Sequence, residues 1–307
     1  MDTPWNTIHL VMKSRRSRFV RNLSHAAEAV GLLAVMAVFA CIPVDWASGL
    51  GGRIGRVLGP RLGISRRAMR NLRFAMPRNS EAENRAIVRG MWENLGRSMA
   101  EYPHLAWICS PRSGRVSVVN AEGVATMMND GKPGIVFGGH LGNWQVGPAT
   151  VHRLMGDSLL SVYRHANNPW VDAMQRRSLA GRNAVTKGAD GGRAVLLHMR
   201  RGGHVGLLVD QKQNDGIAVP FLGHDAMTAP GVARLGRHFD CPVVPIRTER
   251  LGGAHFRFTV LPPLDVAHSG DRDADDLETM TLVNGVIASW VLARPEQWLW
   301  LHRRWPG

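Results

Sequence analysis

The sequence predicts an α/β fold, in which a mixed, largely parallel sheet is flanked by helices and preceded by a hydrophobic N-terminal helix. Three observations support this fold class. From Val116 onward, short apolar runs alternate with segments of helical periodicity, as in domains whose strands are joined by helical crossovers. The 307 residues are 45% hydrophobic, which suits one large domain. An apolar run near the N-terminus has the composition of an additional buried or membrane-embedded helix.

The N-terminal apolar run covers residues 29–42 and is closed by Pro43. At ~1.5 Å per residue a helix of this length spans about 21 Å, which is short of the ~30 Å hydrocarbon core of a bilayer. We therefore expect this helix to be embedded in the membrane, with its basic flank on the cytoplasmic side. A cleaved signal peptide and an ordinary buried helix remain as alternatives. The basic flank consists of Lys13, Arg15, Arg16, Arg18 and Arg21.

Two further helical segments precede the α/β domain. Residues 53–73 carry seven arginines among apolar residues, a pattern of basic amphipathic helices that lie either against anionic lipid or in solvent. Residues 81–105 have apolar side chains at helical spacing and predict one long helix, at whose end Glu101 faces solvent or the functional pocket. The expected division is therefore a basic N-terminus and membrane-anchoring helix (1–50), an amphipathic helical segment packed on the core (51–110) and an α/β domain (111–307).

Within the α/β domain the pattern predicts strands and helices in alternation. Strands are expected at Val116–Val119, Gly134–Phe137, Leu159–Arg164, Val205–Asp210, Val243–Arg247 and Phe256–Leu261. Helices are expected at Ala121–Met128, Asn168–Leu179, Gly192–Arg200, Pro230–His238 and Leu277–Leu292.

The second of these strands leads into the stretch around which the chain is organised. The strand ends at Gly138 and Gly139, His140 follows, and the next residues can open a helix. An imidazole at the carboxyl end of a strand can act as a base, because histidine titrates near neutral pH. Gln145 lies five residues on, close enough to orient the imidazole if the segment is helical. A turn or capping histidine is the alternative for such a pattern taken alone.

Polar side chains end two further predicted strands. Arg164 closes one strand and Asp210 another, so if the strands are parallel neighbours these groups share an edge of the sheet with His140. An acid at a strand end can also simply cap the following turn.

The segment Gly139-His140-Leu141-Gly142-Asn143-Trp144 resembles the His-x4-Asp/Glu motif of the bacterial lipid A biosynthesis lauroyl/myristoyl acyltransferases, which belong to the glycerolipid acyltransferase-like superfamily. The resemblance continues along the chain in the same order, which makes the combination specific. The further blocks are Val162-Tyr163-Arg164, Asn168-Pro169, Val209-Asp210-Gln211, Val219–Gly223, Thr228–Gly231 and Pro295–Trp305. One departure is that Gln145 stands where the family motif has its acid.

The resemblance implies a glycerolipid acyltransferase-like fold and an acyltransferase at the cytoplasmic face of a bacterial inner membrane. It also implies an acyl carrier protein thioester as the acyl donor and a hydroxyl of a lipid A precursor, a phosphorylated glycolipid, as the acceptor. It also implies a functional role for Asp210 and substrate binding by Gln211. Another glycolipid or glycerolipid remains possible as acceptor, because the motif does not encode it.

Acyl transfer requires a base, donors for the oxyanion and groups that hold two lipids. We assign His140 as the base for direct attack of the acceptor hydroxyl, since the sequence has no Gly-x-Ser-x-Gly elbow and none of its three cysteines lies in the motif. Backbone N–H groups of Gly142 and Asn143, helped by Arg164, are candidate oxyanion donors. Candidate headgroup or phosphate ligands, each with a solvated surface or a packing role as the alternative, are Arg164, Arg176, Arg177, Arg303 and Arg304.

Gln145 cannot stabilise an imidazolium as a carboxylate would, although its amide oxygen can fix the tautomer of the ring. Three outcomes are open. The enzyme works with a neutral orienter, another carboxylate such as Asp210 or Glu101 supplies the charge, or the protein is catalytically weak and acts by binding lipid.

The composition of the chain limits the classes of binding partner that we expect. The net charge of +14 favours anionic partners such as phospholipid headgroups, phosphorylated glycolipids and acidic carrier proteins. The sequence contains no nucleic-acid-binding motif, no histidine or cysteine spacing typical of a metal site and no sign of a cofactor. The three widely separated cysteines suggest no disulfide framework.

Overall fold

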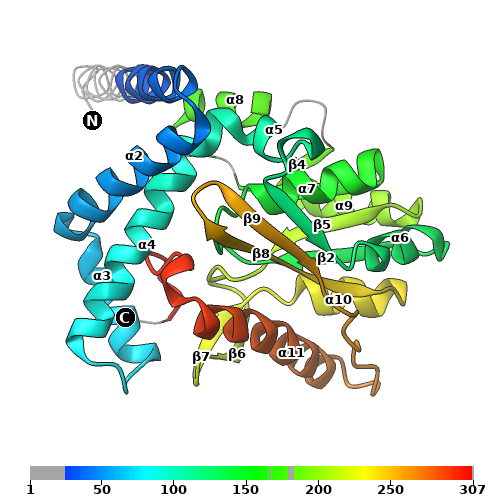
Figure 1. Cartoon of the computed structure of the whole chain (residues 1–307). Helices are drawn as coiled ribbons and strands as arrows, with labels where there is room; N and C mark the ends of the chain where they lie inside the picture. The colour runs from blue at the N-terminus through cyan, green and yellow to red at the C-terminus, as the bar shows by residue number, and fades with distance from the viewer. Residues whose placement is uncertain (1–24, 165, 167, 179–182, 306–307) are drawn as a thin grey trace, which may run out of the picture.

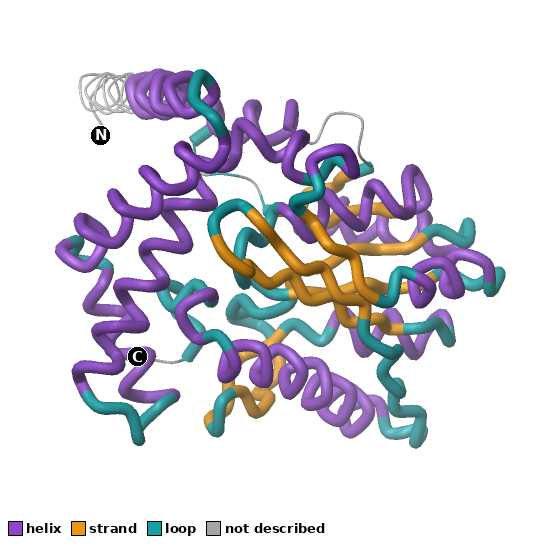
Figure 2. The backbone as a smooth tube through the Cα atoms, viewed as in Figure 1, coloured by secondary structure: helices purple, strands orange, loops and turns teal. Residues whose placement is uncertain are grey.

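A computed structural model of the chain describes residues 25–164, 166, 168–178 and 183–305. Its centre is a seven-stranded sheet with the order β1-β9-β8-β2-β5-β3-β4, in which only the β8–β9 pair is antiparallel (Figures 1 and 2). The predicted mixed, largely parallel sheet is therefore confirmed. The strands are β1 (Val116–Val119), β2 (Gly134–Gly138), β3 (Leu159–Tyr163), β4 (Ala184–Thr186), β5 (His204–Leu208), β8 (Val243–Gly252) and β9 (His255–Val260).

Helices cover both faces of the sheet, which is why the central strand β2 is buried along its whole length. Alternate residues of β2 point to opposite faces: Ile135 and Phe137 join one core with α10 and α11, whereas Val136 joins another with α6 and α7. These and the neighbouring helices are α5 (Leu105–Ile108), α6 (Glu122–Asn129), α7 (Val146–Met155), α8 (Pro169–Ser178), α9 (Ala189–Arg200), α10 (Gly231–Phe239) and α11 (Arg272–Ala293).

A layer of N-terminal helices lies beside the sheet, with the C-terminal segment between this layer and α11 (Figure 1). It consists of α2 (Val44–Leu58), α3 (Ser65–Ala75) and α4 (Glu81–Glu101). Helix α4 begins at a capping box, in which Ser80 and Glu83 satisfy each other's backbone N–H groups. Because α2 runs continuously through residue 50, the expected boundary there falls inside a helix.

The apolar N-terminal segment is helical over residues 25–40. Of the helices in the described part of the chain, none combines the length and the apolar character that crossing a membrane requires. The basic residues 13–21 lie outside the described residues.

Three strands were not predicted. Strand β4 has three residues at the edge of the sheet. Strands β6 (Ile217–Phe221) and β7 (His224–Thr228) form a separate antiparallel hairpin against α11. Short connecting turns complete the chain as 3-10 helices η1 (Gly59–Arg61), η2 (Tyr102–His104), η3 (Pro111–Ser113), η4 (Gly156–Ser158) and η5 (Pro295–Gln297).

Candidate active site

His140 and Asp210 meet at one edge of the sheet. Strands β2 and β5 are parallel neighbours whose last residues, Gly138 and Leu208, pair in register, so the segments that follow them emerge side by side. The His140 ring donates from Nδ1 to Asp210 Oδ1 over 2.7 Å, and its backbone N–H donates to Oδ2 over 2.8 Å. Gly139 allows this approach, because a Cβ there would stand 3.3 Å from Asp210 Oδ2.

The Asp210 carboxylate is completely buried and fully hydrogen-bonded. Its Oδ2 also accepts from the indole N–H of Trp298 over 2.7 Å. Burial opposes ionisation, but the charge and hydrogen bonds of His140 outweigh it and hold the pKa of Asp210 well below its ordinary value. Asp210 therefore remains a carboxylate in any working pH range.

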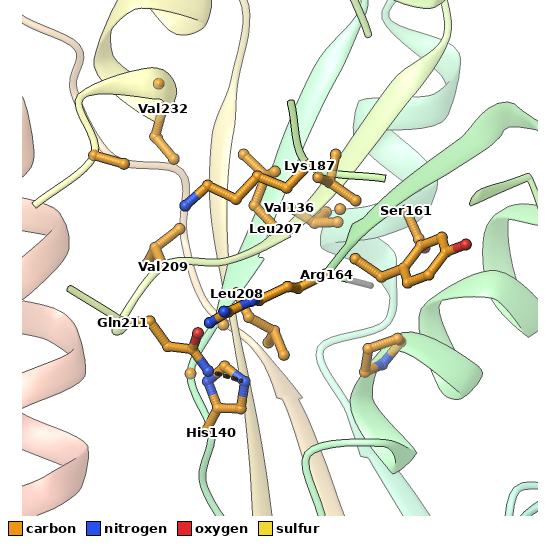
Figure 3. Close-up of a pocket in the computed structure, with 18 of the residues that line it drawn as sticks. Val136, His140, Ser161, Arg164, Lys187, Leu207, Leu208, Val209, Gln211 and Val232 are labelled. Atoms are coloured by element: carbon orange, nitrogen blue, oxygen red, sulfur yellow. Dashed lines mark hydrogen bonds between the residues drawn. The ribbon is translucent and has the colours of Figure 1, made fainter. Parts of the chain in front are cut away.

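The second ring nitrogen of His140 faces the cavity. Since the Asp210 carboxylate can only accept, it fixes the proton on Nδ1 and leaves the lone pair on Nε2. The side-chain amide of Gln211 donates to this Nε2 over 3.1 Å (Figure 3). An incoming hydroxyl can take the place of that amide.

A second imidazole lies against the first. The ring of His302 is centred 5.3 Å from that of His140 in an edge-on arrangement. Burial lowers the pKa of His302 to about 4, so this ring is neutral near pH 7. Its Nε2 is buried without a hydrogen-bond partner among the described residues.

Gln145 does not orient the imidazole, contrary to the expectation. Helix α7 starts only at Val146, so residues 140–145 form a turn and the one-turn spacing assumed between His140 and Gln145 does not exist. Both ring nitrogens of His140 have other partners, and Gln145 Oε1 is buried with no hydrogen-bond partner in the described structure. The carboxylate that contacts the imidazole is that of Asp210.

Gly142 and Asn143 face away from the cavity, toward α4. The N–H of Gly142, with φ at +57°, donates to the carbonyl of Gln297, and its carbonyl accepts from the Asn94 amide over 2.8 Å. The Asn143 side chain donates to Glu101 Oε2 over 2.9 Å. The Gly142 N–H and the Asn143 side chain are thus bound within the turn, and neither residue is among those that line the cavity, so the structure does not place them as the expected oxyanion donors.

Glu101 faces neither solvent nor the His140 pocket. It is fully buried in an ion pair with Arg250 of β8, whose guanidinium contacts Glu101 Oε1 at 2.5 Å. Ser48 of α2 also donates to this carboxylate over 2.7 Å. The arrangement ties the back of the His140 turn to α2, α4 and β8.

Most of the C-terminal segment is packed inside the protein, as the packing alternative expected for its tryptophans and for Arg304. Arg304 is fully buried and donates to the carbonyl of Met227 and the hydroxyl of Thr228, both over 2.8 Å. It is therefore a structural residue and cannot reach a headgroup, whereas Arg303 is exposed. The tryptophans at 298, 300 and 305 are also buried. Arg176 and Arg177 belong to α8, but their side chains lie outside the described residues.

A cavity of about 1040 Å³ opens beside the His140 ring. Apolar side chains from the sheet and α10, among them Val136, Leu207 and Val232, line much of it (Figure 3). Arg164, at the end of β3, extends toward His140 and Gln211 in this view. Lys187 also lines the cavity. His140, Arg164 and Gln211, which follow the ends of β2, β3 and β5, thus line the same largely apolar cavity.

Sequence reasoning missed Trp298, His302 and Arg250 as parts of the site. The first two belong to the C-terminal block of the family resemblance, which was the one available signal. Each contacts its partner across a long sequence separation, 88 residues for Trp298 and Asp210.

Sequence comparison shows the family to which the chain belongs. The sequence profile of the bacterial lipid A biosynthesis acyltransferases matches residues 16–306. The lipid A biosynthesis myristoyltransferase of Escherichia coli is 30% identical over 290 residues, which cover 90% of this chain and 87% of the relative. The E. coli palmitoleoyltransferase is 25% identical over 89% of each chain, and the lauroyltransferase 25% over 76% of each. The chain is thus an acyltransferase that belongs to the bacterial lipid A biosynthesis acyltransferase family.

Proposed function

We propose that the protein transfers a fatty acyl chain from an acyl carrier protein thioester to a hydroxyl of a lipid A precursor, with His140 as general base. The observation that carries this proposal is the His140–Asp210 pair, whose free Nε2 faces an apolar cavity. The names of the relatives support the lipid A precursor as acceptor, and the acyl carrier protein follows from the chemistry of the resemblance.

The proposed reaction begins when the acceptor hydroxyl displaces the Gln211 amide from His140 Nε2. As the hydroxyl oxygen attacks the thioester carbonyl, its proton moves to Nε2, and the resulting imidazolium lies against the Asp210 carboxylate. The tetrahedral intermediate collapses, the C–S bond breaks, and His140 returns the proton to the leaving thiolate. The products are an ester and a free thiol, and no acyl-enzyme forms.

Oxyanion stabilisation must come from the cavity side of the site, because Gly142 and Asn143 are turned away from it. Candidate donors on this side are Arg164, which extends toward His140, and the displaced Gln211 amide (Figure 3). A guanidinium placed where negative charge develops stabilises the transition state more than the ground state.

The shape and charge of the cavity suit lipid substrates with anionic groups. Its volume of about 1040 Å³ is slightly larger than the roughly 300–1,000 Å³ typical of small-molecule sites. The apolar walls suit an acyl chain, and Arg164 and Lys187 suit a phosphate of the acceptor or of the carrier's prosthetic arm. Arg176, Arg177 and the exposed Arg303 remain candidates for further headgroup contacts.

We further propose that the protein works at the cytoplasmic face of the bacterial inner membrane. Four large apolar residues of the helix at 25–40 are at least 50% exposed to solvent, which a membrane-embedded helix would explain. They are Val30, Leu33, Val35 and Val38. The basic sequence before this helix suits anionic cytoplasmic lipid.

The test is an acyl-transfer assay with purified full-length protein in detergent, acyl carrier thioester and lipid A precursor, with a glycerolipid and a second glycolipid as competing acceptors. His140→Ala should lower turnover by roughly 10²–10⁴-fold, the usual contribution of a general base. His238→Ala, on the exposed face of α10, is the matched control. Transfer to another acceptor would reassign the substrate. Lipid binding without turnover would show that the protein binds lipid but does not catalyse the transfer.

A further inference from the structure

Helix α2 exposes a row of large apolar side chains. Trp46, Leu50, Ile54 and Leu58 follow one another at intervals of four residues, and Leu62 continues the row beyond the helix. Each is between 45% and 76% exposed. Side chains four residues apart lie on one side of a helix, so Trp46, Leu50, Ile54 and Leu58 form a ridge, here called the α2 ridge, and Leu62 is exposed shortly after the helix ends.

The opposite face of α2 fixes the orientation of this ridge. Gly51, Gly55 and Gly59 lie against α4 so closely that a Cβ on Gly55 would stand 2.1 Å from the carbonyl oxygen of Trp92. A Cβ on Gly59 would stand 2.2 Å from the Trp92 ring. Since only glycine allows this contact, α2 cannot turn about its axis to bury the ridge against its own domain.

Exposed apolar residues are concentrated in this part of the molecule. Twelve of the 22 exposed large hydrophobic residues in the described chain lie between residues 25 and 75. A contiguous exposed apolar surface marks a site of interaction with a partner or a membrane.

The charge around the ridge selects among possible occupants. Residues 44–75 contain seven arginines and a single acid, Asp45. That acid is already paired with Arg115 over 2.7 Å. Arg53, Arg61 and Arg66 are exposed beside the ridge. Apolar residues bordered by arginines complement a surface that is anionic at its headgroups and apolar just below them.

We propose that the α2 ridge and its flanking arginines form a docking surface on which the folded domain rests in the interface of an anionic bilayer. With 15 residues at ~1.5 Å each, α2 is about 22 Å long and lies parallel to the membrane plane. This inference deepens the proposed membrane association, because it assigns a contact face to the folded domain separate from the N-terminal helix.

The test places an environment-sensitive fluorophore at position 54 in the full-length protein (Ile54→Cys, with Cys41→Ser). Leu282→Cys on α11 is the matched control, because Leu282 is 43% exposed and Ile54 is 45% exposed. With vesicles of phosphatidylcholine and phosphatidylglycerol, emission at position 54 should rise at least about twofold and be quenched by spin-labelled lipid, as expected on transfer into the interface. Emission at position 282 should not change.

Equal responses at positions 54 and 282 would overturn the proposal. A rise at position 54 without vesicles that grows with protein concentration would assign the ridge to a second copy of the chain instead. An equal response to phosphatidylcholine alone would overturn the role of the arginines. Acyl transfer in detergent, measured on the unlabelled protein, reports the proposed reaction separately, so failure of one claim is distinguishable from failure of the other.

Discussion

Two buried carboxylates stand on opposite sides of the His140 turn and have different partners. Asp210 on the cavity side is hydrogen-bonded to the imidazole of His140, while Glu101 on the back is paired with the guanidinium of Arg250. Both carboxylates are at most 1% exposed. The two carboxylates are therefore equally buried, and they differ in the residue with which each is paired.

The difference separates catalysis from positioning. The Glu101–Arg250 ion pair takes no part in the proposed proton transfer, and it can hold the turn in place. In the proposed mechanism His140 gains a full charge when it accepts a proton, so the Asp210 carboxylate would stabilise a state that arises during the reaction. The same chemical group thus serves the fold on one side and, in the proposed mechanism, the reaction on the other.

The largest expected effect comes from removing the charge on the cavity side. Asp210→Asn keeps the size of the side chain but places an amide against Nδ1, which favours the wrong tautomer of His140. In a serine protease triad this change costs about 10⁴ in rate, and we expect roughly 10³–10⁴ in kcat here. Steady-state kinetics of acyl transfer would measure it. Asp240→Asn, at a carboxyl that is 83% exposed, is the control, and a loss below tenfold at Asp210 would contradict the assignment.

Removing the partner of Glu101, on the side of the turn that faces away from the cavity, should affect stability more than catalysis. Arg250→Met leaves Glu101 buried without its counter-charge and should lower the free energy of unfolding by about 3–5 kcal/mol, measured by urea unfolding in detergent. Arg257→Met on the neighbouring strand is the matched control, because Arg257 is 50% exposed and its ion pair with Glu249 is loose at 3.6 Å.

Adding Glu101→Gln to Arg250→Met tests the cause of that loss. If an unpaired charge is responsible, the double variant should recover part of the stability, since the remaining amide is neutral. A double variant that is less stable than Arg250→Met would show that lost packing dominates instead.

The sequence allowed the cavity side of the site to be predicted, because strand periodicity is local. Apolar runs located β2 and β5, and the rule that parallel strands end at one edge brought His140 and Asp210 together. The back of the turn could not be predicted in this way. The Glu101–Arg250 pair joins residues 149 positions apart, and no periodic pattern encodes such a contact.

Local geometry explains the remaining errors. Gly142 adopts a positive φ within a turn, so the helix assumed from His140 begins only at Val146, and Gly142, Asn143 and Gln145 point elsewhere than a helix would place them. Strand β6 contains Pro220, and proline argues against a strand when only the pattern is read. Strand β4 is too short to show alternation.

The smallest effect is expected at Gln145, where the family motif has its acid. If that acid were needed beside the imidazole, Gln145→Glu would raise the rate. Because Asp210 and Gln211 already occupy both ring nitrogens of His140, a second carboxylate in this partly buried position finds no vacant donor on the ring. We expect turnover that is unchanged or lower by less than about tenfold, the latter through the cost of burying a further charge.

Gln145→Met is the matched control, and it should retain turnover because Gln145 Oε1 accepts no hydrogen bond from the described residues. A gain of activity in Gln145→Glu alone would show that the base is limited by its orientation and that Asp210 does not fully replace the missing acid.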